Sequence, residues 1–415
     1  DLFAEEAAKV LCANGMHVWL FSSLRPTPEL SFAVRELGAT VGIVVTASHN
    51  PPEYNGYKVY WADGGQIVPP HDNGIIDEVR SVGKDIRLME KSDAEKEGLL
   101  EVIDERIDAP YREMVKSCSL RPELLREHGK DLKVVFTALH GTGSVVLPRV
   151  MSEMGVEVIP VEEQNKPDGN FPTVEKPNPE ESAAMKMALE LGEQRRADLV
   201  MGTDPDSDRL GIAVPEYSGA LRLITGNQLG VLLADYIFST RAETDSMPQN
   251  PAFVKTIVTT ELQRLIAESY GARSYDVLTG FKYIAEKIKE FEETGESYVF
   301  GGEESYGYLV TDRVRDKDAI SAAFVTAEMA LYHRTQGKTL LDRLEEIYAE
   351  YGYFQEILLS RTFKGQKGKE AMDELMKRLR EDPPAEVGGI GVKEIRDYKK
   401  QKAFRRTDGS LIEEI

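Results

Sequence analysis

The loop at residues 202–214 carries three carboxylates at alternate positions, Asp204, Asp206 and Asp208, between two predicted strands. Carboxylates this close together repel one another unless a cation or several hydrogen-bond donors offset their charge. Carboxylate oxygens favour a hard cation, either Mg²⁺ or Ca²⁺. The spacing therefore predicts a metal-binding loop.

Two other interpretations of this loop compete with a Mg²⁺ site. An EF-hand does not fit, because its sixth position would be Arg209 rather than glycine and its twelfth would be Pro215 rather than glutamate. An Asp-rich turn stabilised by its own caps stays open. Arg209, which directly follows the acidic run, would suit an incoming phosphate or sugar oxygen.

A serine and a histidine directly follow another predicted strand, in the stretch TASHNPPEYNGYK at residues 46–58. Ligands of open α/β sheets lie beyond the carboxyl ends of the strands. Ser48 could be a nucleophile there if a neighbour activates it, and His49 and Lys58 are candidates for proton transfer or charge stabilisation. A turn in which Ser48 and Asn50 bond their own backbone is the alternative.

The stretch FGGEESYGYL at residues 300–309 also follows a predicted strand. Glu303 and Ser305 are two positions apart, so in an extended loop they point the same way. A carboxylate beside a hydroxyl suits sugar hydroxyls, which both donate and accept hydrogen bonds. A solvated acidic turn is the alternative.

Two further stretches offer groups that attract phosphate. Thr279, Gly280 and Lys282 lie at a predicted strand-to-helix junction, where backbone N–H groups bind anions. Lys317 lies between two aspartates in VRDKDAI at residues 314–320. A charge cluster at the start of a helix is the alternative for Lys317.

Regular elements must position these loops, and the chain alternates short β-rich runs with amphipathic helical runs. This alternation implies α/β layers with largely parallel sheets. One predicted helix spans residues 27–38, with Thr27 as its N-cap and Gly38 past its end. The predicted strands are residues 17–22, 39–47, 132–139, 156–161, 197–202, 253–258 and 297–302.

Composition narrows the class of protein. The 415 residues carry a formal net charge of −20, which argues against nonspecific nucleic-acid binding. The sequence contains no run of about 18 apolar residues, so it predicts no membrane-spanning helix. With only two cysteines, Cys12 and Cys118, a reducing, cytoplasmic setting is expected. The sequence does not begin with Met, so we expect residues upstream of it.

The length favours several domains. We expect a phosphoserine-bearing domain at residues 1–128, a metal-binding domain at 129–226, a sugar-binding domain at 227–348 and a partial C-terminal phosphate-binding domain at 349–415.

Taken in order, TASHNPPEYNGYK, DPDSDR, TGFK, GEES and RDKD resemble the α-D-phosphohexomutase superfamily, and the likeness covers nearly the whole chain. It is greatest for the branch of bacterial phosphoglucomutases and phosphopentomutases. The resemblance implies an α/β fold with three consecutive mixed-sheet domains around a cleft, followed by a partial fourth domain of α+β type. It also implies an intramolecular phosphotransferase that acts on a small-molecule sugar phosphate, as a monomer or dimer.

The resemblance further assigns roles to single residues. Ser48 is the expected phosphoserine, and it joins the three aspartates as a ligand of Mg²⁺. Lys58 is an acid/base candidate, and His49 lies beside the nucleophile. The expected substrate contacts are Arg209, Thr279, Gly280, Lys282, Glu303, Ser305 and Lys317.

The reaction implied is the interconversion of glucose 1-phosphate and glucose 6-phosphate, with glucose 1,6-bisphosphate as intermediate and activator. A phosphopentomutase, a phosphomannomutase and a non-catalytic sugar-phosphate-binding protein stay open. The phosphomannomutase branch tends to carry a histidine where this chain has Gly307, which speaks against dual mannose/glucose specificity.

Two signatures of the superfamily are missing from the sequence, an N-terminal Gly-Thr-x-Gly-x-Arg segment and an Arg-x-Ser-Gly-Thr-Glu-Pro loop of the last domain. We therefore expect the chain to be part of a longer protein and to turn over glucose 1-phosphate poorly on its own.

A dinucleotide-dependent oxidoreductase is a rival from another class. Residues 139–146 follow a predicted strand and open a predicted helix, with Glu162 about 20 residues further on. Val146 replaces the third glycine of that fingerprint, and nothing else in the sequence supports hydride transfer.

Overall fold

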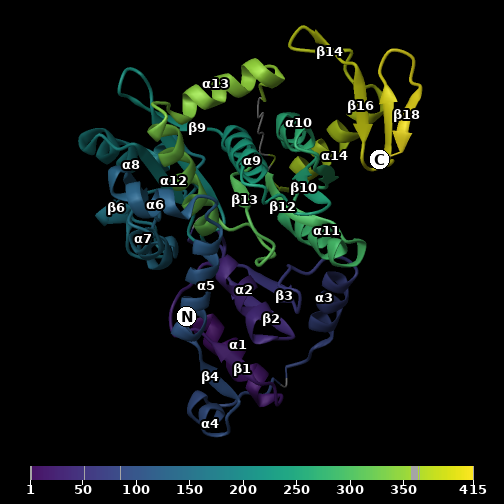
Figure 1. Cartoon of the computed structure of the whole chain (residues 1–415). Coiled ribbons are helices and arrows are strands. Elements are labelled where there is room, and N and C mark those ends of the chain that lie inside the picture. The colour runs from purple at the N-terminus through teal and green to yellow at the C-terminus, as the bar shows by residue number, and fades with distance from the viewer. Residues whose placement is uncertain (1, 51, 85, 357–362, 364, 415) are drawn as a thin grey trace. The chain divides into compact units, whose positions relative to one another are not determined.

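The structure is a computed structural model that describes residues 2–50, 52–84, 86–356, 363 and 365–414. The chain forms two compact units, residues 1–355 and residues 356–415 (Figure 1). The larger unit contains three consecutive segments, which we call the first segment (2–128), the second segment (129–225) and the third segment (226–355).

The first segment combines helices with two small sheets. Its elements are α1 (Leu2–Ala13), β1 (Val18–Leu20), α2 (Thr27–Leu37), β2 (Val41–Val45), β3 (Tyr57–Trp61), α3 (His71–Ser81), α4 (Lys91–Lys96), β4 (Leu100–Val102), α5 (Asp104–Ser117) and α6 (Pro122–His128). Strands β1 and β4 pair in parallel, whereas β2 and β3 pair antiparallel. The antiparallel pair carries the Ser48 loop between its strands.

The two ends of helix α2 can be compared with the predicted helix boundaries. Gly38 ends the helix in a left-handed conformation with φ of 63°, as the sequence predicts. The prediction that Thr27 is the N-cap is wrong, because Pro26 holds that position and Thr27 is the first helical residue. The Thr27 side chain is therefore free to turn toward Asp206, from which its Oγ1 lies 3.4 Å.

The second segment is a five-stranded mixed sheet in the order β6-β5-β7-β8-β9. Its elements are η1 (Gly129–Asp131), β5 (Lys133–Thr137), α7 (Gly143–Glu153), β6 (Glu157–Pro160), η2 (Glu162–Gln164), α8 (Ser182–Arg195), β7 (Leu199–Thr203), β8 (Leu210–Pro215) and β9 (Leu221–Ile224). Helices α7 and α8 supply the long connections that parallel strands need.

Burial on both faces explains the apolar run Val134–Phe136 in the middle of β5. Val134 and Phe136 belong to the large core cluster that includes α7, whereas Val135 belongs to a separate cluster with Met185 of α8. Successive side chains of a strand point to opposite faces, so a helix on each face requires apolar residues at every position.

The third segment is a four-stranded sheet in the order β11-β10-β12-β13, parallel except for the β12–β13 hairpin. Its elements are α9 (Gly226–Glu243), β10 (Pro251–Thr256), α10 (Glu261–Ser269), β11 (Arg273–Val277), α11 (Phe281–Thr294), β12 (Ser297–Glu303), β13 (Gly307–Leu309), α12 (Ala319–Thr335) and α13 (Leu340–Tyr351).

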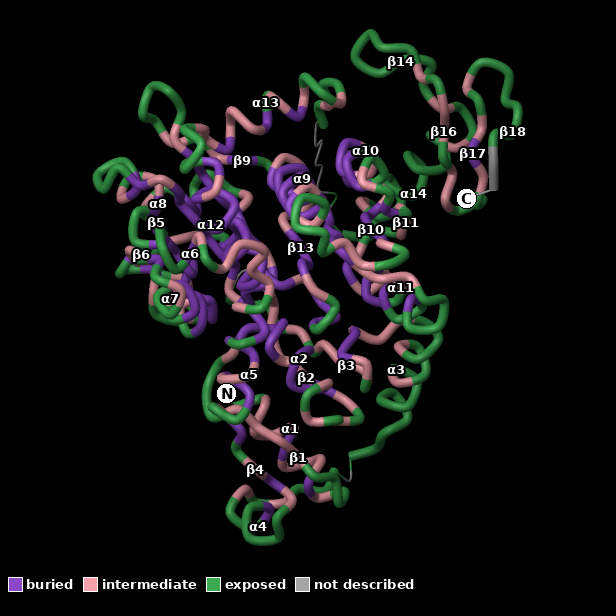
Figure 2. The backbone as a smooth tube through the Cα atoms, viewed as in Figure 1, coloured by how far each residue is buried: buried purple, intermediate pink, exposed green. Residues whose placement is uncertain are grey.

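Helix α12 joins the three segments. It packs against α5 and α6 of the first segment, α7 of the second and α9 of the third. Its residues are almost all buried (Figure 2), which fits a mostly apolar sequence, AISAAFVTAEMALYHRT, with apolar residues on every side of the helix. Asp318 caps its start by accepting hydrogen bonds from the backbone N–H groups of Ile320 and Ser321.

The smaller unit contains α14 (Gly365–Glu381) followed by β14 (Glu386–Val387), β15 (Ile390–Gly391), β16 (Glu394–Asp397), β17 (Lys402–Arg405) and β18 (Leu411–Glu414). Strands β16, β17 and β18 form an antiparallel sheet. The predicted α/β class, with three α/β segments and a C-terminal α+β part, is confirmed. None of the described helices is both long and apolar enough to cross a membrane.

One acidic side chain lies in the core of the first segment without a charge partner. Glu29 of α2 is fully buried, and within the described residues neither of its carboxylate oxygens has a hydrogen-bond partner. Arg25 and Arg112 are near, but Arg25 forms a bidentate pair with Asp108, at 2.8 Å for both contacts. Burial, reinforced by the neighbouring Asp108, raises the pKa of Glu29 well above its usual value, so Glu29 is held as the neutral acid.

We expect Glu29→Gln to be nearly neutral for stability at about pH 5 and stabilising at about pH 8. Between its unfolded and folded pKa values the folded state binds more protons, so wild-type stability falls as pH rises. Each unit by which the pKa is raised corresponds to about 1.4 kcal/mol at higher pH. Unfolding midpoints at both pH values measure this, with the exposed Glu36→Gln of the same helix as the control. Equal destabilisation at both pH values would show instead that the carboxylate is charged in the fold.

Candidate active site

The Ser48 loop directs its hydroxyl away from its own backbone. Ser48 has a left-handed φ of 54°, uncommon for a residue with a side chain, and its N–H donates to Thr46 Oγ1 at 2.9 Å. Asn50 closes the turn by donating to the carbonyl of Ala47, as the turn alternative expects. The Ser48 hydroxyl instead lies 3.2 Å from Asp204 Oδ2 and 3.2 Å from His49 Nδ1.

The Asp loop joins β7 to β8 and buries all three carboxylates. One oxygen of each of Asp204, Asp206 and Asp208 lies within 4.8 Å of the others. Asp204 Oδ1 accepts hydrogen bonds from the N–H groups of Asp208 and Arg209, both at 3.0 Å. Buried Oδ1 atoms of Asp206 and Asp208 have no hydrogen-bond partner among the described residues.

Three segments of the chain hold the backbone of this loop. The carbonyl of Pro205 accepts from the N–H of Thr142 at 2.8 Å. The next carbonyl, of Asp206, accepts from Thr27 at 2.9 Å, and that of Ser207 accepts from Ala319 at 3.2 Å. These donors come from the second, first and third segments respectively, so the loop is the point at which the segments meet.

Two lysines reach the carboxylates from opposite segments. Lys58 Nζ lies 3.1 Å from Asp206 Oδ2 and 3.9 Å from Asp208 Oδ2. Lys317 Nζ lies 3.1 Å from Asp208 Oδ2 and 3.8 Å from Glu303 Oε1. Burial alone would lower the pKa of each lysine, but the neighbouring carboxylates outweigh it and raise both pKa values. Both side chains are therefore ammonium ions.

The three carboxylates differ in how strongly their surroundings favour ionisation. Burial and mutual repulsion raise the pKa values of Asp204 and Asp208. Burial opposes ionisation of Asp206 too, but the Lys58 ammonium lowers its pKa. Partnerless buried oxygens on two of three clustered carboxylates fit a hard divalent cation, because each could supply one ligand atom. The buried triad could therefore bind a metal.

His49 is the neutral group of the site. Burial, together with the positive charge of Arg209, lowers the pKa of His49 to about 4. At neutral pH its imidazole is uncharged, and Nδ1 can accept a hydrogen bond from Ser48 Oγ at 3.2 Å.

Glu303 and Ser305 lie on the tight β12–β13 hairpin, in which Glu303 pairs with Gly307. Glu303 is buried, and burial raises its pKa although Lys317 opposes this. A side chain at Gly307 would have to displace its neighbours, because a Cβ there would lie 2.5 Å from Lys317 Cδ and 2.7 Å from Glu303 Oε1. The Lys317 and Glu303 side chains therefore fill the space beside Gly307 of the hairpin.

Arg209 and the 279–282 junction are placed differently. Arg209 Nη1 donates to Glu180 Oε1 at 2.9 Å, so its guanidinium is held beside the Asp loop. Gly280 stands at the N-cap of α11, and the Lys317 ammonium lies 5.9 Å from the ring centre of Phe281, the next residue. Among the described residues, Thr279 and Lys282 form no hydrogen bond or ion pair with the Asp triad.

The sequence did not identify several residues that hold these groups. Glu180 fixes Arg209, and the Tyr60 hydroxyl donates to Asp316 Oδ2 at 2.6 Å, next to Lys317. The one available signal was that Tyr60 is two positions from Lys58 on the same strand and so shares its face. Glu180 gave no signal beyond its turn-rich surroundings.

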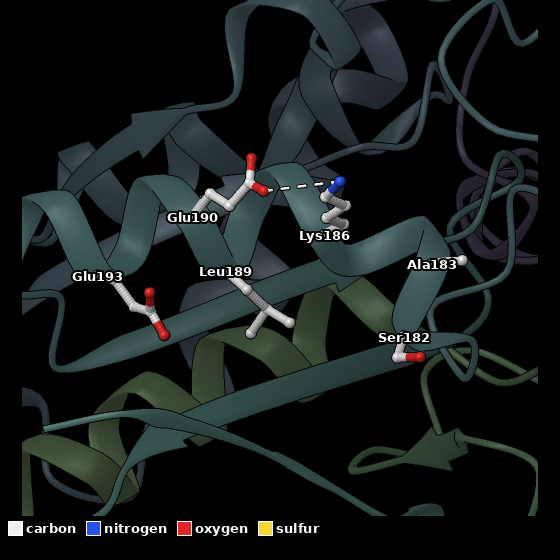
Figure 3. A pocket seen from close by; sticks show the side chains of 6 residues that line it. All are labelled: Ser182, Ala183, Lys186, Leu189, Glu190 and Glu193. Carbon is white, nitrogen blue, oxygen red and sulfur yellow. Dashed lines mark ion pairs between the residues drawn. The ribbon is translucent and has the colours of Figure 1, made fainter. Parts of the chain in front are cut away.

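A surface hollow along α8 lies outside this site. Its volume is about 310 Å³, and its lining comes from a single helix (Figure 3). Lys186 and Glu190 pair along the helix at 3.8 Å, which leaves Glu193 as the remaining charged side chain of the lining. The lining residues are Ser182, Ala183, Lys186, Leu189, Glu190 and Glu193.

Sequence profiles of three α/β/α domains match the chain in order. They are described as phosphoglucomutase/phosphomannomutase domains I, II and III, and they match residues 1–85, 109–219 and 225–351. The chain belongs to the phosphoglucomutase/phosphomannomutase family. The resemblance to the α-D-phosphohexomutase superfamily is thereby confirmed, and the family's enzymes are isomerases that transfer phosphoryl groups.

Relatives of known name and structure agree with this family. The phosphoglucomutase of Staphylococcus aureus strain MRSA252 is 36% identical over 97% of this chain and 71% of its own length. A Thermus thermophilus protein classed provisionally as a phosphomannomutase is 26% identical, with a TM-score of 0.67 over 82% of this chain and 70% of that one. The Paramecium phosphoglucomutase parafusin, 16% identical, shares the fold with a TM-score of 0.68 over 99% of this chain and 74% of its own.

We expect Mg²⁺ alone to stabilise the folded protein and Asp206→Asn to weaken Mg²⁺ binding by about tenfold or more. At about 100 times its dissociation constant, a ligand that binds only the folded state adds about 2.7 kcal/mol. Melting curves over a Mg²⁺ series measure the shift. Asp245→Asn is the matched control, because it removes the same charge at an exposed position. A wild-type melting temperature that Mg²⁺ does not move would make the triad structural.

Proposed function

We propose that this chain interconverts glucose 1-phosphate and glucose 6-phosphate through a phosphoserine at Ser48 and a glucose 1,6-bisphosphate intermediate. The family membership and the phosphoglucomutase relatives support this reaction. The observation that carries it is the Ser48 hydroxyl, presented 3.2 Å from Asp204 Oδ2 at the edge of a buried carboxylate cluster with two ammonium groups.

The reaction balances as two phosphoryl transfers. The bond from phosphorus to Ser48 Oγ breaks while a bond to the free hydroxyl of the sugar monophosphate forms, which gives the bisphosphate. The second transfer returns the other phosphoryl group to Ser48 Oγ and releases the isomeric monophosphate. No phosphate is gained or lost over the cycle. The proton that the sugar hydroxyl loses in the first transfer goes to Ser48 Oγ, and in the second transfer it passes to the sugar oxygen that gives up its phosphoryl group.

His49 is the better placed of the two proton-transfer candidates. Its neutral imidazole lies 3.2 Å from Ser48 Oγ, so Nδ1 can take up or return the proton of that oxygen. The Lys58 ammonium, 3.1 Å from Asp206, is a proton donor and a positive charge. Lys58 would therefore favour negative charge on the transferring group rather than remove a proton.

Mg²⁺ would be held by Asp204, Asp206 and Asp208 together with the oxygen on Ser48. When bound, it neutralises charge on the phosphoryl oxygens. The three backbone contacts of the Asp loop hold the carboxylates in a fixed arrangement, and burial shields them from water. The Lys58 and Lys317 ammonium groups place two positive charges beside the triad.

The substrate would lie between the Ser48 loop and the β12–β13 hairpin. Glu303 and Ser305 would bind the ring hydroxyls, with Lys317 between them and the carboxylates. Arg209 and Lys282 would contact phosphate or sugar oxygens, and the backbone at Thr279 and Gly280 would offer N–H donors. Positioning of this kind accounts for much of the catalysis of phosphoryl transfer.

We expect Ser48→Ala to fold normally and to lower the turnover of glucose 1-phosphate by about 1,000-fold or more, since the nucleophile is removed. Intact-mass analysis of the wild type should reveal a species heavier by one phosphoryl group, located on the Ser48 peptide. The exposed Ser182→Ala is the control and should keep wild-type activity. Retained activity in Ser48→Ala would refute the nucleophile assignment.

Sugar preference separates the members of the superfamily. We expect a higher kcat/KM for glucose 1-phosphate than for mannose 1-phosphate or ribose 1-phosphate, because the hairpin offers Glu303 and Ser305 to a hexose ring and Gly307 leaves no side chain to add a contact. Coupled assays on the three substrates measure this. A preference for ribose 1-phosphate would identify a phosphopentomutase instead.

A further inference from the structure

Glu304 stands between the two proposed sugar-binding residues and has no assigned role. Its Oε2 accepts hydrogen bonds from Thr256 Oγ1 at 2.9 Å and Thr259 Oγ1 at 3.4 Å. Its Oε1 accepts from Ser305 Oγ at 3.2 Å. One carboxylate therefore connects the hairpin tip to the end of β10.

The surroundings of Glu304 leave it little freedom. The Thr256 and Thr259 hydroxyl oxygens lie 2.8 Å apart and both residues are buried, so the single hydrogen of Thr259 is shared between Thr256 Oγ1 and the more distant Glu304 Oε2. The Glu304 carbonyl lies against the start of α9, because a Cβ at Gly226 would be 2.0 Å from its oxygen. On the other side of the tip, the Tyr306 carbonyl accepts from the N–H of Leu210 at 2.9 Å. The tip is fixed from the second and third segments at once.

The contact with Glu304 settles the role of the Ser305 hydroxyl as donor or acceptor. A serine hydroxyl has one hydrogen to donate and two lone pairs to accept with. Ser305 Oγ is the donor in its contact with Glu304 Oε1, so the Ser305 hydrogen is committed to Glu304. The lone pairs of Ser305 Oγ stay available to another group.

We infer that Glu304 is a positioning and specificity residue that makes Ser305 a hydrogen-bond acceptor toward substrate, so that the site selects a sugar ring hydroxyl that donates. This rests on the proposed function, because it assumes that Ser305 faces a sugar. The surroundings of Glu303 are different from those of Ser305. Lys317 Nζ lies 3.8 Å from the Glu303 carboxylate and can donate a hydrogen bond to a sugar oxygen.

Replacement of one ring hydroxyl by fluorine tests the inference, because organic fluorine accepts weakly and cannot donate. For the hydroxyl that Ser305 contacts, the deoxy and deoxyfluoro analogues of glucose 1-phosphate should lose affinity equally, by about tenfold or more, since the acceptor is left unpaired. If Ser305 donates instead, the fluoro analogue should keep part of the affinity that the deoxy analogue loses.

Variants of Glu304 separate positioning from folding. Glu304→Ala frees the Ser305 hydrogen, so KM for glucose 1-phosphate should rise by about tenfold while kcat changes by less than about threefold. Its discrimination between the hydroxyl and fluoro analogues should collapse. Glu304→Gln keeps an oxygen that can accept from Ser305 and should stay within about threefold of wild type. A purely structural role would lower melting temperature and activity together without changing the analogue ratio.

Partner and control variants complete the set. Thr256→Val should resemble Glu304→Ala in part, and Thr256→Ser should restore wild-type behaviour, because only the hydroxyl contacts Glu304. Glu293→Gln, exposed on α11, removes an equal charge and should have no effect.

Calorimetric dissociation constants for the analogues keep this test independent of turnover. If the wild type binds the sugar phosphates without isomerising glucose 1-phosphate, the proposed reaction fails, but the analogue ratios still judge the role of Glu304. If the wild type isomerises glucose 1-phosphate and Glu304→Ala keeps both its KM and its fluoro discrimination, the inference about Glu304 is overturned while the reaction stands. Wild-type protein that binds neither glucose 1-phosphate nor any of the analogues overturns both.

Discussion

The three carboxylates of the Asp204–Asp208 turn are buried within 4.8 Å of one another, and their repulsion must be resisted by the rest of the larger unit. Consecutive carbonyls of the turn accept N–H groups from Thr142, Thr27 and Ala319. Each donor opens or precedes a helix, so each contact ties the turn to a rigid element. The docking of the three segments and the geometry of the site are consequently one structural feature.

Ion pairs also hold the segments together at the Asp204–Asp208 turn. Lys58 and Lys317 approach the triad from the first and third segments, and each pairs with a carboxylate at 3.1 Å. Buried charges are tolerated only when they are paired and hydrogen-bonded. The two ion pairs therefore contribute to the docking of the first and third segments on the second. The Tyr60–Asp316 hydrogen bond, next to both lysines, links the same two segments without adding a cation.

The local part of this site could be predicted from sequence, and the long-range part could not. Ser48 and the aspartates follow strands with recognisable spacing, and the strand–helix alternation gave the α/β class. Glu180 and Tyr60 were missed because their partners, Arg209 and Asp316, are distant in the chain or belong to another element. Thr27 was misassigned as a helix cap because its true partner, Asp206, lies 179 positions away. The raised pKa of Lys58 also depends on such distant carboxylates.

The β12–β13 hairpin is also tied to the Asp loop by hydrogen bonds and by Lys317. The Tyr306 carbonyl accepts from Leu210, which ends the Asp loop, and the Glu304 carboxylate bonds to Thr256, which ends β10. A side chain at Gly307 would crowd Lys317, whose Nζ reaches Asp208. A shift of the Asp loop would therefore displace Lys317 and the hairpin tip together. The Asp loop and the hairpin tip are therefore coupled, since Leu210 bonds to Tyr306 and Lys317 contacts both Asp208 and Glu303.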